Sequence, residues 1–110
     1  MIEILEETLV VRINKDIDHH NAQIIRENVE KIYKDKNLKN IIFDFSKVHF
    51  MDSSGIGMCI GRFKLVRAMN GKFIACGLTY EVERIFDMAG LSKIITICDD
   101  VKSSMTYINL

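Results

Sequence analysis

The chain has 110 residues, 48% of them hydrophobic, and 15 basic against 15 acidic side chains give it a formal net charge of zero. This length favours one domain, residues 1–110, and the missing basic excess argues against direct nucleic-acid or membrane binding. No apolar run approaches the roughly eighteen residues of a transmembrane helix, and the N-terminus lacks a cationic signal-peptide region. The 3 cysteines are widely spaced. They are typical of reduced thiols, which favours a cytoplasmic location.

The first half of the chain is predicted to form two strands, a helix and a third strand. Apolar residues alternate within 2–6 and 9–13, which is the pattern of strands. Asp18 follows as a candidate helix cap, and apolar residues then recur with helical spacing until residues 35–37. The β-rich run IIFDF at 41–45 predicts a central strand.

The second half is predicted to alternate helices and strands. In chain order we expect a helix that stops at Asn70–Gly71, a strand at 72–77, a helix from Thr79 to Gly90, a strand at 93–98 and a last helix that starts at Asp99 or Asp100. The complete order is β-β-α-β-α-β-α-β-α. After the opening hairpin, this alternation favours parallel strands, so we expect an α/β domain with a mixed sheet of about five strands and about four helices.

Two serines connect a predicted strand to a predicted helix in FMDSSGIG, residues 50–57. Such connections lie at the carboxyl ends of parallel strands, where α/β folds usually carry their functional loops. A phosphate on Ser53 or Ser54 would be expected to meet free amides at the helix N-terminus. Gly55 and Gly57 would let a partner approach the backbone closely, while Gly61 would let the helix approach the sheet. A plain serine N-cap on a tightly packed helix explains the same residues.

Other patterns carry less weight. GIGMCIG resembles a loosened dinucleotide fingerprint, but the acidic residue expected about twenty positions later is missing. His19 and His20 beside Asp18 do not predict a metal site, because adjacent helical residues point in different directions. The nucleophile elbow of serine hydrolases is absent as well. We therefore expect no catalytic residue, no metal and no cofactor, although a small nucleotide-binding domain stays an alternative.

Three segments point to a known family: DHHNA at 18–22, FMDSSGIGMCIGRFK at 50–64 and RIFDMAGLSKII at 84–95. They resemble the anti-sigma factor antagonists, which are bacterial members of the STAS domain family. The resemblance covers nearly the whole chain, and the D-S-S-G-x-G segment is specific. The family fold, a mixed sheet with helices packed against it, agrees with the predicted element order.

This resemblance implies a regulatory binding protein and not an enzyme. In the family, the unmodified antagonist binds an anti-sigma factor that is also a serine kinase, and so frees the sigma factor. The kinase phosphorylates the serine after the motif aspartate, here Ser53, and the complex dissociates. A serine phosphatase then restores the binding form. The match implies a role in sporulation and a monomer or weak dimer, and a STAS subunit of a stress-signalling complex is a further alternative.

The resemblance also implies which residues contact the partner. Carried over by position, they are Asp18, His19, His20, Asn21, Met51, Asp52, Ser53, Ser54, Gly55, Ile56 and Gly57.

Overall fold

The computed structural model describes residues 1–110. Its strands are β1 (Ile2–Leu5), β2 (Thr8–Arg12), β3 (Asn40–Asp44), β4 (Phe73–Cys76) and β5 (Thr96–Cys98). Its helices are α1 (His19–Asp35), α2 (Ser53–Ala68), α3 (Tyr80–Ala89) and α4 (Val101–Ile108), with a 3₁₀ turn η1 at Leu91–Lys93. These elements appear in the predicted order, so the α/β fold with five strands and four helices is confirmed.

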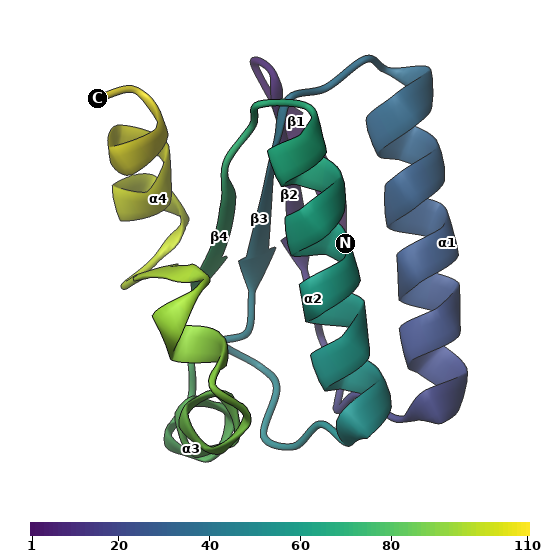
Figure 1. Cartoon of the computed structure of the whole chain (residues 1–110), viewed down its shortest axis with the longest axis vertical. Coiled ribbons are helices and arrows are strands. Elements are labelled where there is room, and N and C mark those ends of the chain that lie inside the picture. The colour runs from purple at the N-terminus through teal and green to yellow at the C-terminus, as the bar shows by residue number, and fades with distance from the viewer.

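The five strands form one mixed sheet in which spatial order equals chain order. A tight turn with Glu6 at a φ of 57° folds β1 back onto β2, and this pair is antiparallel. The remaining neighbours are parallel. Right-handed crossovers that each move one strand in the same direction place their helices on one face of the sheet. Figure 1 shows α1 and α2 in front of the strands, and α3 joins them through Val82 and Phe86 of the main core.

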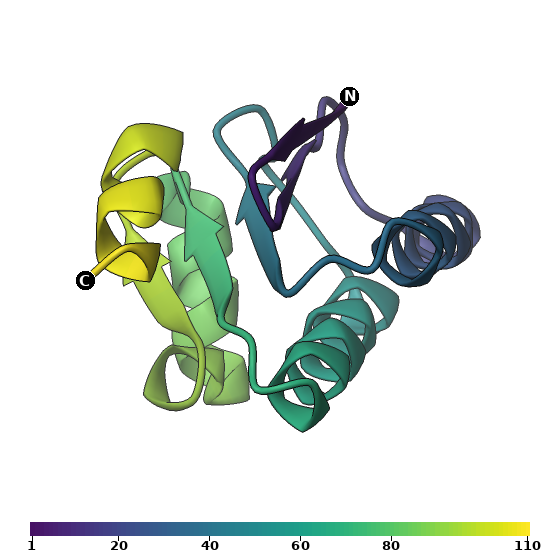
Figure 2. The same ribbon diagram turned by 90° about the horizontal axis from the view of Figure 1, so that it is seen from above.

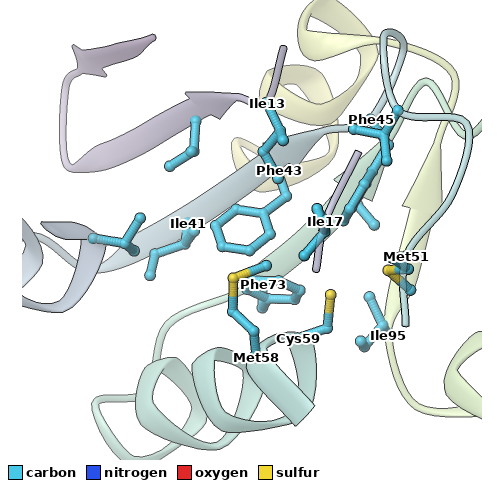
Figure 3. Close-up of a cluster of buried hydrophobic side chains, with 14 of the residues drawn as sticks. Ile13, Ile17, Ile41, Phe43, Phe45, Met51, Met58, Cys59, Phe73 and Ile95 are labelled. Atoms are coloured by element: carbon cyan, nitrogen blue, oxygen red, sulfur yellow. The ribbon is translucent and has the colours of Figure 1, made fainter. Parts of the chain in front are cut away.

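The main core lies between the sheet and these three helices. Phe43 of β3 occupies its centre and meets Phe45 and Phe73 edge-on, with ring centroids 6.0 and 5.1 Å away. Met58 and Cys59 project from α2 toward these rings (Figure 3). Edge-to-face aromatic pairs add stability beyond that of the buried area.

The opposite face of the sheet carries a smaller core. Val10, Ile42, Ile74 and Cys76 are fully buried there, and α4 contributes apolar side chains that pack against them. Seen from above, α4 lies on the far side of β4 and β5 from α1 and α2 (Figure 2). Because the central strands are buried on both faces, their sequences are nearly continuous runs of apolar residues.

Two expectations differ from the structure. The last strand was predicted at 93–98, but β5 begins only at Thr96. Gly90 adopts a left-handed φ of 76°, and the buried Leu91 starts a 3₁₀ turn that takes up the preceding residues. The helical spacing of Ile56, Ile60 and Phe63 predicts an apolar stripe on α2, but these side chains are only half-buried against the core. No helix combines the length and the apolar character needed to cross a membrane.

Candidate functional site

The segments that begin α1 and α2 are joined by a short parallel bridge between Ile17 and Met51. The Ile17 amide donates to the Phe50 carbonyl at 3.0 Å, and the Asp52 amide donates to the Ile17 carbonyl at 3.1 Å. The two helices therefore start side by side at one end of the sheet (Figure 1). Residues 18–21 and 51–57, separated by about thirty positions in the chain, meet there.

A second contact fixes the loop before α2. One carboxylate oxygen of Asp16 accepts hydrogen bonds from the His49 amide at 2.8 Å and the Phe50 amide at 3.2 Å. The Phe50 ring is left 55% exposed beside the site. Exposed aromatic side chains are enriched at contact surfaces, and no local pattern in the sequence indicated this role for Phe50.

Each helix start is capped by an aspartate. Asp18 accepts from the Asn21 amide at 2.9 Å, and the Asn21 side chain accepts from the Asp18 amide at 2.8 Å, which completes a capping box. The backbone hydrogen bond from Asn21 lowers the pKa of Asp18. At α2, Asp52 accepts from the Ser54 amide at 2.8 Å and from the Gly55 amide at 3.3 Å.

The cap of α2 corrects two expectations. The helix is capped by Asp52 and not by a serine. The amides of Ser54 and Gly55, which a phosphate was expected to find free, already donate to the Asp52 carboxylate. A phosphate on the preceding residue would meet this negative charge, so we expect it to extend into solvent.

The two serines have different surroundings. Ser53 is exposed in the first turn of α2. Ser54 is half-buried, and its Oγ lies 3.1 Å from Nδ1 of His19 in α1. The hydroxyl of Ser53 is therefore accessible to another protein, whereas that of Ser54 links the two helices. The sequence alone did not reveal this His19–Ser54 contact.

The predicted contact residues fall into three classes of exposure. Asp18, His19, His20, Ser53 and Gly57 are exposed; Asn21, Asp52, Ser54 and Ile56 are half-buried; Met51 and Gly55 are buried. Met51 and Gly55 were predicted to belong to the contact surface, and this prediction is wrong because both are buried. A Cβ on Gly55 would lie 2.9 Å from the Met51 Cβ, so both residues support the site from beneath and cannot form its surface.

The other glycines of α2 also have distinct surroundings. Gly57 is exposed, and a Cβ there would meet no atom within 4 Å, which is consistent with close approach by a partner. A Cβ on Gly61 would meet none either, so the expectation that Gly61 lets the helix approach the sheet is wrong. All three glycines lie inside a regular helix. They do not form the loop that a nucleotide phosphate requires, which argues against the nucleotide-binding alternative.

A surface hollow of about 330 Å³ lies between the first two turns of α1 and α2. Its lining consists of His19, Ala22, Gln23, Arg26, Ser54, Gly57 and Met58. Gln23 and Arg26 were not predicted as site residues. They follow His19 by four and seven positions, a spacing that places all three residues on one face of α1. This spacing could have indicated them from the sequence.

Known proteins share this architecture. The STAS domain model matches residues 1–104. The anti-sigma F factor antagonist of Paenibacillus polymyxa is 31% identical over 102 residues, which cover 93% of this chain and 87% of that protein. The anti-sigma-B factor antagonist of Bacillus subtilis is 32% identical over 93 residues, which cover 84% and 83%.

A solved structure agrees with these relatives. The anti-sigma factor antagonist SpoIIAA in its unphosphorylated form superposes with a TM-score of 0.76 at 25% identity, covering 96% of this chain and 93% of that one. The family model matches nearly the whole chain, and the relatives are covered over most of their length. The chain therefore belongs to the STAS domain family and, within it, to the anti-sigma factor antagonists.

Proposed function

We propose that this protein is a phosphorylation-controlled antagonist of an anti-sigma factor. In its unmodified form it binds an anti-sigma factor with serine kinase activity and so releases a sigma factor for transcription. Phosphorylation of Ser53 by that kinase ends the binding, and a serine phosphatase restores it. The protein itself is a substrate and binding module, it acts in the cytoplasm as a monomer or weak dimer, and the similarity to anti-sigma F antagonists favours sporulation as the process.

The observation that carries the proposal is the exposed hydroxyl of Ser53, one residue after the Asp52 cap. The cap hydrogen bonds are made by Asp52, so a phosphate on Ser53 removes none of them. The side chain is exposed, so the core under α2 stays packed. Phosphorylation can therefore alter the surface while the fold is kept.

The change at the surface is mainly one of charge. A phosphate adds about −1.5 to −2 charges at neutral pH. It would stand beside Asp52 and near the exposed His19 and His20, on the surface that the resemblance assigns to the partner. A charge that must be buried without a partner in an interface costs several kcal/mol, and about 1.4 kcal/mol corresponds to a tenfold change in affinity.

The test uses purified anti-sigma factors from the source organism, each incubated with the protein and then with ATP. We expect one of them to bind the wild type and to add a single phosphate to it, seen by intact mass and located by fragmentation. Ser53→Ala should bind equally well but resist release by ATP. Ser54→Ala is the matched control and should still be phosphorylated and released. Phosphorylation of the Ser53→Ala variant would overturn the assignment of Ser53.

A role in a stress-signalling complex is the second candidate, because the anti-sigma-B antagonist is as similar to this chain as the anti-sigma F antagonist. Both candidates use the same serine. The anti-sigma factor that binds in the experiment above distinguishes them, since the two pathways use different kinases.

A further inference from the structure

We propose that the hollow between α1 and α2 receives an aspartate or glutamate side chain of the anti-sigma factor, and that Arg26 binds its carboxylate. This inference rests on the proposed function and adds the chemistry of recognition. It concerns a part of the surface that the motif residues alone do not define, because Arg26 lies two turns into α1.

The lining of the hollow favours an anion. The polar groups that face it come from His19, Gln23, Arg26 and Ser54, and no carboxylate is among the lining residues. Gly57 contributes no side chain, so the entrance stays open from the side of α2. Guanidinium, amide, imidazole and hydroxyl groups can all donate hydrogen bonds to a carboxylate.

Arg26 differs from the other arginines because no side chain of the chain holds it in a salt bridge or a cation–π contact. Arg12 pairs with Glu3, Arg62 pairs with Glu30, Arg67 stacks on Phe63 and Arg84 stacks on Tyr80. Arg26 forms no salt bridge or ring contact of this kind. An arginine beside a hollow with its donors free is suited to bidentate binding of a carboxylate from another molecule.

The acidic groups nearest to Arg26 on α1 are already engaged. Glu27 accepts from Gln23 at 3.2 Å. Glu30 accepts from Lys34 at 2.9 Å and lies 3.4 Å from Arg62. Arg26 forms no salt bridge with either carboxylate. The hydrogen bond from Lys34 is the main cause that lowers the pKa of Glu30, and the charges of Arg62, Lys34 and Arg26 add to it.

A second cation lies between the same two helices. The Arg62 side chain is only 9% exposed, and its Nε and Nη1 have no hydrogen-bond partner. Burial lowers the pKa of Arg62, the charge of Glu30 opposes this shift, and the charge of Arg26 adds to it. Two arginines and one glutamate thus share this interhelical region, and the excess positive charge attracts an anion toward the hollow.

The position of the hollow connects this site to the proposed switch. Ser54 lines it, and Ser53 is the adjacent residue. A phosphate on Ser53, extending into the solvent beside the hollow, would repel an incoming carboxylate. Phosphorylation would therefore disfavour the bound partner by charge alone, without a rearrangement of the fold.

The experiment measures affinity by calorimetry with the purified anti-sigma factor that binds the wild type. Arg26→Ala is expected to weaken binding about tenfold, and Arg26→Glu about a hundredfold, because a charge pair is lost and then replaced by repulsion. Arg67→Glu is the matched control. It makes the same change of charge on an exposed residue in the last turn of α2 and should alter the affinity less than about twofold.

A charge reversal on the partner completes the test. Exposed acidic residues of the anti-sigma factor are changed to lysine one at a time, and one of these variants should restore binding to Arg26→Glu. The inference is overturned if Arg26→Glu binds as tightly as the wild type, if Arg67→Glu is equally weakened, or if no reversal rescues binding. In those cases wild-type binding and release by ATP still support the proposed function. If no anti-sigma factor binds the wild type, the proposed function fails and this inference fails with it.

Discussion

Gly55 decides how closely α2 can approach the segment before α1. A Cβ at this position would lie 2.9 Å from the Met51 Cβ and 3.1 Å from the Ile17 Cγ2, closer than side chains normally come. Gly55→Ala gains about 1 kcal/mol of helix propensity but forces both neighbours to move, which typically costs about 1–3 kcal/mol. We therefore expect a net loss of up to about 2 kcal/mol in the free energy of unfolding, measured by urea denaturation.

Gly61→Ala is the matched control in the same helix. Its new methyl group would meet no atom within 4 Å, so only the gain in helix propensity remains. We expect this variant to be more stable than wild type by about 0.5–1 kcal/mol. If both variants shift in the same direction, packing against Met51 and Ile17 does not explain the glycine at position 55.

The role of a single residue could be predicted from the sequence where that role depends only on neighbouring residues in the chain. Asp18 was predicted as a helix cap because its carboxylate can accept from backbone amides, and it does so. The family resemblance placed Met51 on the contact surface, yet it is 2% exposed. Burial of that residue depends on the bridge to Ile17, a contact between distant segments that no local pattern contains.

Between elements, the contact of α1 with α2 contains a buried charge. The Arg62 side chain is 9% exposed and has two nitrogen atoms without hydrogen-bond partners, and its Nη2 lies 3.4 Å from Oε2 of Glu30. Replacing a buried charge with an apolar side chain of similar volume is often neutral or stabilising. We expect Arg62→Met to keep or raise the free energy of unfolding, by up to about 2 kcal/mol, in urea denaturation.

Removing the other partner should have the opposite effect. Glu30→Ala leaves Arg62 buried without a carboxylate, and we expect a loss of about 1–2 kcal/mol after allowing for the 35% exposure of Glu30. Lys34→Ala is the control for the exposed pair with Glu30 and should cost less than about 0.5 kcal/mol. A loss of stability in Arg62→Met comparable to that in Glu30→Ala would contradict this account.

Helices and strands could be predicted where their apolar residues recur with the spacing of a helix or alternate as in a strand. In α3, Val82 and Phe86 are buried at helical spacing, and Thr79 and Gly90 mark its ends as predicted. In α2 the pattern of apolar residues was misleading. This helix contacts both α1 and the sheet, and it contains three glycines and a buried arginine. The buried face of α2 includes Gly55, Cys59, Arg62 and Val66. Only Cys59 and Val66 are apolar enough to indicate from the sequence that this face is buried.

For the whole molecule, the sheet topology follows from the element order and the right-handed crossover, so it could be predicted in outline. The packing of α4 against the second face of the sheet could not be predicted. The last helix is short, and its partners Val10, Ile42 and Ile74 come from three strands far apart in the sequence. Only the assembled sheet brings these side chains into one surface.

The buried thiols of the two cores contribute to the loss of stability at alkaline pH. Burial raises the pKa of the Cys59 thiol in the main core and of the Cys76 thiol in the smaller core to about 12, from a usual value of 9.0. A thiol whose pKa is raised by folding stabilises the native state fully below the unfolded pKa, and this contribution is lost as the pH rises toward the folded value.

Each buried thiol should therefore cost the folded state about 1 kcal/mol between about pH 9 and pH 10, because the unfolded chain ionises there and the native one does not. Urea denaturation at both pH values measures this loss, which is about 2 kcal/mol for the two thiols together. Cys59→Ala lowers the stability at every pH through its cavity, but its loss between the two pH values should be about half that of the wild type. An unchanged loss in Cys59→Ala would show that this thiol ionises as readily in the native state as in the unfolded one.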